Sequence, residues 1–437
     1  MNCGKTEKII IIAGSAALAA LFAVWCVGAD YGAAGFIAAI ICVALFYAVC
    51  VRFVPVWLMS WRGEEEIALR PEKEKRTELR IFFSFLAWDI VIILLAYLIR
   101  VFLGYRESFS QYLAFWTCTD SRHYLDIARD WYLSEGSMDR LVQLVFLPGY
   151  PIAVSLLNVL IGNYLISGLT VSALCFAGAG CVFYKLARLD MTHEASLRAL
   201  KYLLVSPAVF FFAAPMSESL FLLLALGCVY LTRRGKFFPA CILGALAAFT
   251  RSVGIILLVP VLFELASKRK KAKDWLCLLI IPLGFAAYCF INYRVSGDAF
   301  KFMEYQSEHW GQHIGLFWGT AAYQTEYLIS SARENIPNFF GLWLPNLMAA
   351  FGGLGIMVLA VKKLRASYTA FFIAYFAVTI GATWLLSAPR YLAVMFVLYL
   401  ALALLTENKK ANGILAAGSV LLFFAYFCAF VARWQVW

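Results

Sequence analysis

The chain has 437 residues, of which 63% are hydrophobic and 14% are charged, and its formal net charge is +11. Soluble domains are roughly half apolar and a quarter charged, so this composition excludes an ordinary soluble domain. Apolar runs recur from end to end and are too long and continuous for barrel strands, which predicts an all-α polytopic membrane protein.

The positive charge is concentrated in short loops between the apolar runs. This is the positive-inside pattern of membrane proteins, and we therefore expect no nucleic-acid partner. The twelve cysteines are scattered, mostly inside apolar runs, and only Cys118 lies in a long polar loop. Their spacing predicts neither a disulfide framework nor a metal site.

The first three predicted helices lie near 9–28, 33–59 and 81–103. The first run resembles a signal peptide, but its length and the apolar run that follows favour an uncleaved helix. The loop 62–80 is dense in charge and is expected in the cytoplasm, together with the N-terminus. Residues 1–80 thus form an additional pair of helices, whose role is either topology or a membrane-protein partner, before the main region 81–437.

The next segment, about 104–140, is then extracytoplasmic and rich in polar and aromatic residues: Trp116, Asp120, His123, Asp126, Trp131 and Asp139. After it, two apolar runs are separated by Gly162-Asn163, where the inside-outside alternation allows one crossing. We expect 164–184 to cross the membrane, and 141–161 to lie in the outer interface or to re-enter.

Basic clusters predict the inner loops of the rest of the chain. Two pairs of short helices are expected at 202–232 and 237–266, with outer turns at 214–219 and 250–252. Later helices are expected at 275–293, 337–361, 367–386, 390–406 and 412–432, and residues 294–335 form a second large outer loop. The total is about thirteen spans.

The same alternation sends Asp120, Glu218, Arg251 and Arg390 to one face of the membrane. Charge inside or beside spanning helices is costly and is functional by default. Arginine binds phosphate through two parallel hydrogen bonds, a carboxylate removes the proton of an attacking hydroxyl, and a second carboxylate favours an oxocarbenium-like state. The set therefore suits sugar transfer from a lipid-linked sugar phosphate.

Five local motifs resemble the GT-C mannosyltransferases, in particular the second mannosyltransferase of glycosylphosphatidylinositol anchor synthesis and its bacterial relatives. In the family's order they are Asp120-Ser121-Arg122-His123-Tyr124-Leu125-Asp126-Ile127-Ala128, Phe146-Leu147-Pro148-Gly149-Tyr150-Pro151, Ser206-Pro207 with Ala214 through Phe221, Thr250-Arg251-Ser252-Val253-Gly254, and Pro389-Arg390-Tyr391-Leu392. Where the family usually has Trp directly before the Asp, this chain has Thr119, with Trp116 nearby.

The resemblance implies a GT-C-like fold with two large outer loops. It also implies inverting transfer of mannose from polyprenyl- or dolichyl-phosphate mannose to a lipid-linked or glycan acceptor, as in the anchor α-1,6-mannosyltransferase. The implied roles are catalysis for Asp120 (the base) and Glu218, donor-phosphate binding for Arg251, Arg390 and Arg122, and acceptor binding for His123, Tyr124 and Tyr150. No cofactor is expected. Glu308-His309 with His313 provides no evident third metal ligand, which leaves metal dependence open.

Each of these residues also has a structural interpretation. Asp120 has the features of a solvated loop acid, and Glu218 those of an acid favoured by a helix N-terminus. Arg251 and Arg390 have those of interfacial anchors that extend to the headgroups.

Two other classes of function compete with the enzyme. The short helix pairs suit a transporter or lipid flippase, but we find no internal repeat, and the polar groups map to one face rather than the midplane. A non-catalytic subunit of a glycosylation complex would tolerate loss of Asp120. The compact loops favour a bacterial cytoplasmic membrane, or the endoplasmic reticulum if the source is eukaryotic, with the active face extracytoplasmic or lumenal.

Overall fold

The computed structural model describes residues 4–63, 76–132, 142–268 and 271–436. Within these ranges the expectation of an all-helical chain is confirmed, since the one extended pairing is an isolated bridge between Ile314 and Ala382. Asp139, the centre of the charged loop 62–80 and part of the basic run 268–273 lie outside the described residues.

Seven helices among the described residues are long and apolar enough to cross a membrane. They are α1 (Lys5–Gly28), α2 (Ala33–Arg62), α3 (Thr77–Phe102), α8 (Tyr164–Ala187), the continuous segment Ala272–Ser296 that ends in α14 (Ile280–Ser296), the segment Ile336–Lys363 that contains α18 (Leu344–Ala360), and α22 (Lys409–Val431). The multi-pass character of the protein is therefore clear from length and composition.

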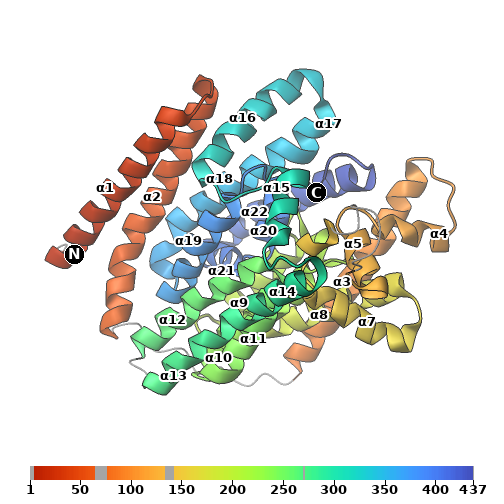
Figure 1. Ribbon diagram of the computed structural model, residues 1–437, viewed down its shortest axis with the longest axis horizontal. Coiled ribbons are helices and arrows are strands. Elements are labelled where there is room, and N and C mark those ends of the chain that lie inside the picture. The colour runs from red at the N-terminus through yellow and green to blue at the C-terminus, as the bar shows by residue number, and fades with distance from the viewer. Residues whose placement is uncertain (1–3, 64–75, 133–141, 269–270, 437) are drawn as a thin grey trace.

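Shorter apolar helices fill the space between the long ones (Figure 1). These are α7 (Gly149–Ile161), α11 (Phe237–Thr250), the segment Ser252–Ser267 that ends in α12 (Leu258–Ser267), α19 (Ala366–Ile380) and α21 (Phe396–Leu405). A straight span needs about 20 residues, so the expected count of thirteen spans is not confirmed.

The remaining helices and helical turns complete the described fold. They are α4 (Phe109–Leu113), η1 (Ala114–Trp116), α5 (Ser121–Asp130), η2 (Val142–Val145), α9 (His193–Leu204), η3 (Val209–Phe212), α10 (Glu218–Arg233), α15 (Lys301–Trp310), α16 (Phe317–Glu334) and α20 (Ala388–Ala393). The segment 294–335, which is expected as an outer loop, is instead largely helical. Its longest helix, α16, buries one face by packing along α2.

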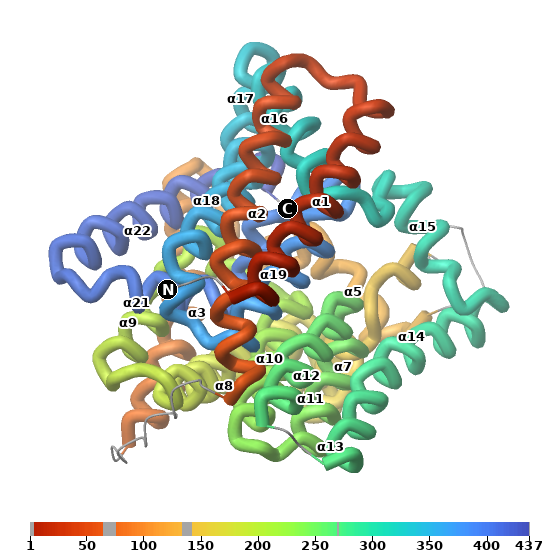
Figure 2. The backbone as a smooth tube through the Cα atoms, turned by 90° about the vertical axis from the view of Figure 1, so that its left-hand side faces the viewer, coloured from red at the N-terminus to blue at the C-terminus, as the bar shows by residue number. Residues whose placement is uncertain are grey.

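The additional N-terminal helices form a hairpin. No residue of α1 is buried, whereas α2 packs along α16, α18 and α19 (Figure 2). The Glu326 side chain of α16 accepts a hydrogen bond from the backbone N–H of Gly32, just before α2 begins. The hairpin is therefore joined to the rest of the chain mainly through α2, with Phe22 of α1 also packing on Trp318 of α16, at 6.0 Å between ring centroids.

The two apolar runs on either side of Gly162 differ in length. Helix α8 has 24 residues, whereas α7 has 13 and packs beside the first turns of α8. Leu156, Val159 and Leu160 of α7 are exposed. This arrangement agrees with one crossing at α8 and a short apolar helix before it.

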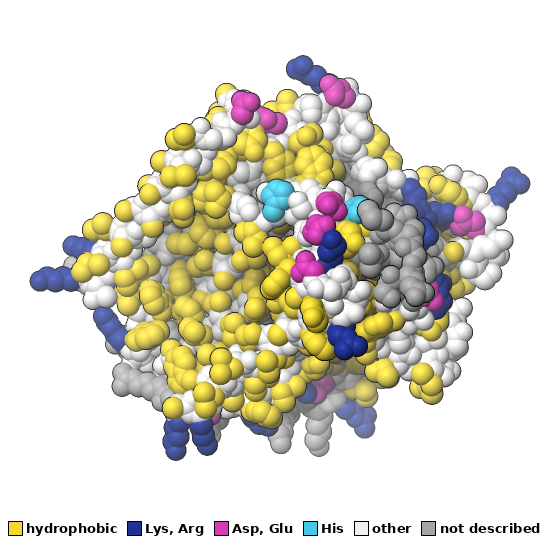
Figure 3. All heavy atoms as spheres, viewed as in Figure 1, with side chains coloured by type: hydrophobic (Ala, Val, Ile, Leu, Met, Phe, Trp, Pro, Cys, Tyr) yellow, Lys and Arg dark blue, Asp and Glu magenta, His cyan; other side chains and the backbone are white. Residues whose placement is uncertain are grey.

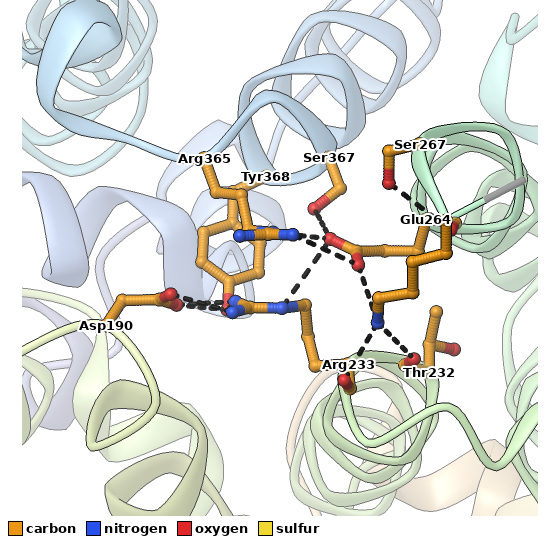
Figure 4. Close-up of polar contacts among 9 residues, drawn as sticks. Asp190, Thr232, Arg233, Glu264, Ser267, Arg365, Ser367 and Tyr368 are labelled. Atoms are coloured by element: carbon orange, nitrogen blue, oxygen red, sulfur yellow. Dashed lines mark hydrogen bonds and ion pairs between the residues drawn. The ribbon is translucent and has the colours of Figure 1, made fainter. Parts of the chain in front are cut away.

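A network of buried charges joins the ends of α10, α12 and α19 and the loop after α8 (Figure 4). Arg233, the last residue of α10, makes a two-pronged ion pair with Asp190, at 2.5 and 2.7 Å. Glu264 accepts from Arg365 Nε at 2.7 Å, from Lys268 Nζ at 3.0 Å and from Ser367 Oγ at 2.9 Å. Charges in such a setting are tolerated only when they are paired in this way.

Most of the face shown in Figure 3 is hydrophobic, and several Lys and Arg side chains lie along its lower edge. Hydrophobic side chains over the long helices and charge at their ends are what a bilayer requires of a spanning protein. The structure thus agrees with an integral membrane protein.

The turn between α11 and α12 depends on a glycine. A Cβ added at Gly254 would lie 2.4 Å from both the carbonyl carbon of Ala247 and the backbone nitrogen of Ala248. No side chain fits at that separation, so only glycine lets the chain fold back so closely behind Arg251.

We expect Glu264→Gln to lower the free energy of unfolding by about 3 kcal/mol, because Arg233, Arg365 and Lys268, which lie 3.5, 2.7 and 3.0 Å from the Glu264 carboxylate, would then surround a neutral amide. Thermal unfolding of the detergent-solubilised protein measures this loss. The exposed acid Glu407 provides the control, and a Glu264→Gln midpoint equal to that of Glu407→Gln would contradict the expectation.

We also expect Gly254→Ala to destabilise the protein by roughly 1–3 kcal/mol, because the added methyl group overlaps the backbone of α11. Gly352→Ala in α18 is the matched control, since nothing lies within 4 Å of its added Cβ. The same unfolding assay compares the two, and equal midpoints would show that the turn can relax around the methyl group.

Candidate active site

Of the four charged residues that the sequence assigns to one face, three stand at helix ends and the fourth lies within a short helix. Asp120 precedes α5, Glu218 is the first residue of α10, Arg251 directly follows α11, and Arg390 lies in the six-residue helix α20. Pro215 and Pro389 lie near two of these ends, where proline prevents a helix from continuing toward its N-terminus. The helix breaks thus place charged side chains at the same level of the structure.

These four side chains form one continuous row of ion pairs. Arg390 Nη2 lies 2.5 Å from Asp120 Oδ2, and Arg390 Nε lies 3.1 Å from Glu218 Oε1. Arg251 Nη1 donates to the same Glu218 oxygen. The row Asp120–Arg390–Glu218–Arg251 therefore joins residues that are up to 270 positions apart in the sequence.

The row differs in exposure from one end to the other. The side chain of Asp120 is 25% exposed, whereas those of Arg390, Glu218 and Arg251 are 6%, 2% and 9% exposed. A reactant from solution reaches Asp120 more easily than it reaches the arginines. The arrangement thus has an open carboxylate and a buried pair of guanidinium groups.

Hydroxyl and aromatic groups surround the two arginines. Ser217 Oγ accepts from Arg251 Nη1 at 3.2 Å and lies 2.9 Å from the hydroxyl of Tyr124. The ring of Tyr391 lies 5.1 Å from the guanidinium carbon of Arg251 and 5.5 Å from that of Arg390. Ser217 and Tyr391 both lie inside the motifs, but the motifs alone do not indicate that they contact the arginines.

One oxygen of Glu218 is left without a hydrogen bond. Glu218 Oε1 serves both arginines, while the buried Oε2 has no partner among the described side chains. With Asp120 beside Arg390, the row contains two carboxylates and two guanidinium groups and is formally neutral. A phosphate that approaches the arginines therefore competes with these carboxylates for their N–H donors.

The turn before Asp120 has an unusual backbone. Thr119 has a φ of 50°, in the left-handed region that β-branched residues rarely adopt. The Ser121 N–H donates to the Cys118 carbonyl and closes the turn. Such outliers persist where the surrounding structure imposes them, often next to functional groups.

Not every predicted site residue joins the row. Arg122 is 79% exposed and pairs with Asp126 at 3.8 Å, whereas Arg390 and Arg251 are 6% and 9% exposed. Tyr150 is fully buried and bonds to the Gly168 carbonyl at 2.8 Å, which is a packing contact.

The two aromatic candidates on α5 lie closer to the row. Tyr124 reaches it through Ser217. The ring of His123 stacks on Phe146 at 4.6 Å, and burial lowers the pKa of His123 while Asp120 and Asp126 act in the opposite direction. His123 therefore has a neutral ring beside Asp120 near neutral pH.

The described part of the chain shows no clustered metal ligands. Within the ranges that the structure covers, no group of three or more His, Cys, Asp or Glu side chains is arranged to hold a metal ion.

Residues 100–272 match the family model described as mannosyltransferase (PIG-V). No curated protein sequence matches the chain. Among solved structures, ArnT from Cupriavidus metallidurans bound to undecaprenyl phosphate is similar, with 14% identity and a TM-score of 0.47 over 76% of this chain and 62% of that one. The archaeal oligosaccharyltransferase AglB from Archaeoglobus fulgidus, in complex with an inhibitory peptide and a dolichol-phosphate, has 14% identity and a TM-score of 0.36 over 80% of this chain and 56% of that one.

The chain thus spans less than two thirds of the length of either solved protein. The matched range 100–272 contains Asp120, Glu218 and Arg251, and Arg390 lies beyond it. Over this range the chain is similar to the mannosyltransferase (PIG-V) family, which confirms the resemblance drawn from its motifs and supports a membrane glycosyltransferase.

Proposed function

We propose that this protein transfers mannose from a polyprenyl- or dolichyl-phosphate mannose to a hydroxyl of a lipid-linked or glycan acceptor, with inversion at the sugar carbon. The observation that carries the proposal is the row Asp120–Arg390–Glu218–Arg251, which unites an accessible carboxylate with two buried guanidinium groups. The family match over residues 100–272 supports the same class of reaction.

Arg251 and Arg390 are the proposed ligands of the donor phosphate. When the sugar leaves, negative charge builds up on the phosphate, and two guanidinium groups already in place stabilise it. Their side chains are 9% and 6% exposed, so little water competes for them. Arg122 is 79% exposed and pairs with Asp126 instead of a member of the row, and we do not assign it this role.

Glu218 is proposed to position the arginines rather than to contact the sugar. Its Oε1 is shared by Arg251 and Arg390, and its side chain is 2% exposed. Without this carboxylate, two adjacent guanidinium groups would repel each other in a medium that screens charge poorly. This role differs from direct catalysis, the role that the motif implies.

Asp120 is proposed as the base. The acceptor hydroxyl attacks the anomeric carbon of mannose, its proton passes to the Asp120 carboxylate, and the bond from that carbon to the phosphate oxygen breaks. The electron pair of that bond leaves with the polyprenyl phosphate. Attack from the side opposite the phosphate inverts the anomeric centre.

The proposed active face is extracytoplasmic or lumenal. Helix α10 has 16 residues and extends from Glu218 to Arg233, a length of about 22 Å. The basic residues Arg233, Arg234, Lys236 and Lys268 gather at the end opposite the row, as the positive-inside rule expects of the cytoplasmic side. We favour a bacterial cytoplasmic membrane because the loops are compact.

Residues 81–437 are proposed as the catalytic region, because all four members of the row lie within it. Residues 1–80 are proposed as an addition that binds a membrane-protein partner or sets topology. Helix α1, which has no buried residue, is the part of this addition that remains available for a partner.

We expect Asp120→Asn to lower transfer of labelled mannose from polyprenyl-phosphate mannose by about 10²- to 10⁴-fold, because the amide cannot accept the proton. Membranes that carry equal amounts of each protein are compared. Asp126→Asn is the matched control, since Asp126 lies on α5, which Asp120 directly precedes, and has a side chain 28% exposed. Full activity of Asp120→Asn would exclude Asp120 as the base. A wild-type protein without activity would show that the proposed class of donor or acceptor is wrong.

We expect Arg390→Ala to weaken binding of polyprenyl phosphate about 10- to 100-fold, because a charge-assisted contact is lost. Inhibition of the transfer reaction by unlabelled polyprenyl phosphate gives the binding constant. Arg122→Ala should leave that constant unchanged, because Arg122 is 79% exposed and apart from the row. An equal effect of the two substitutions would show that the anion binds through general surface charge.

A further inference from the structure

The backbone at Leu385 and Ala388, where the chain enters the helix that carries Arg390, is held by buried amide side chains. Helix α20 has only six residues, and a helix of that length is not stable by itself. Its position must therefore be set by its neighbours. Arg390 lies two residues after Ala388, the first residue of α20.

Asn346 of α18 contacts both sides of this junction. Its Oδ1 accepts from the backbone N–H of Ala388 at 2.9 Å, and its Nδ2 donates to the Leu385 carbonyl at 3.2 Å. Asn346 thus caps the N-terminus of α20 from a different helix, a role that a residue directly before the helix usually fills. The residue is 1% exposed.

Gln324 of α16 binds the same carbonyl. Its Nε2 donates to the Leu385 oxygen at 2.7 Å, and it is also 1% exposed. The adjacent Tyr323 hydroxyl accepts from the Leu385 N–H at 2.6 Å. Both polar groups of the Leu385 backbone are therefore bound by side chains of α16, with α18 adding a second donor to the carbonyl.

We propose that Asn346 and Gln324 are positioning residues that hold Arg390 between Asp120 and Glu218 and thereby set the affinity for the donor phosphate. The inference rests on the proposed function of Arg390. Neither amide contacts a member of the row in the contacts that the structure records, so each acts through the backbone of 385–388. Helix α2 packs against both α16 and α18, so the N-terminal hairpin supports the same assembly.

The size of the expected effect follows from the cost of the broken bonds. Removing a buried donor leaves the Leu385 carbonyl with fewer partners, and a buried polar group that loses its partner favours rearrangement of the segment. A displaced Arg390 then loses contact with the phosphate. We expect the KM for polyprenyl-phosphate mannose to rise about tenfold in Asn346→Leu and in Gln324→Met.

The experiment compares these two variants with wild type and with Asn292→Leu, using the full-length protein. Asn292 is a fully buried asparagine of α14 that bonds within its own helix, to the Tyr288 carbonyl at 3.1 Å. Two measurements are made on each protein. Hydrogen exchange of the amides of 384–392 reports whether the segment is held, and transfer kinetics report KM and kcat for the donor separately.

The expected result is faster exchange at 384–392 and a raised donor KM in Asn346→Leu and Gln324→Met, with neither change in Asn292→Leu. A variant that merely folds less well contains less active enzyme, which lowers the maximal rate at an unchanged KM. In Arg390→Lys, adding Asn346→Leu should cause little further loss of transfer, because the residue that Asn346 positions is already altered.

Unchanged exchange in both variants would overturn the inference, and so would faster exchange with a wild-type KM. A wild-type protein that transfers no mannose would overturn the proposed function instead. In that event the exchange comparison decides by itself whether the two amides hold the Arg390 segment.

Discussion

The candidate site depends on one carboxylate oxygen that is shared by two arginines. Glu218 Oε1 accepts from Arg251 and lies 3.1 Å from Arg390 Nε. In a setting with little water, neither guanidinium group is tolerated there alone, and the two together are tolerated only with a counter-ion between them. Four separate helices end or begin near this carboxylate. Their positions bring Glu218, Arg251 and Arg390 together and leave Asp120 at the accessible end of the row.

Much of the fold follows from the sequence because the bilayer imposes strong rules on composition. The long helices end within a few residues of their predicted limits; α2, for example, covers Ala33–Arg62 where 33–59 is expected. The segment 294–335 is predicted less well, since α16 is polar enough to resemble a loop and becomes a packed helix only through contact with α2. Single-chain patterns do not reveal a partner that lies almost 300 residues earlier in the sequence.

The site is predicted in part for the same reason. Alternation of inside and outside loops brings Asp120, Glu218, Arg251 and Arg390 to one face, and the structure joins them in one row. The alternation says nothing about the burial of a side chain, so it does not separate Arg122, which is 79% exposed, from Arg390, which is 6% exposed. It also does not find Asn346 or Gln324, because buried amides in apolar helices have no motif of their own.

The charge network at the far end of α10 has a mechanical consequence. Glu218, the first residue of this helix, forms ion pairs with two arginines, and Arg233, its last residue, forms an ion pair with Asp190. A rod fixed by ion pairs at both ends cannot slide along its axis without breaking one of them. Helix α10 is therefore fixed along its axis and provides a stationary frame for the candidate site.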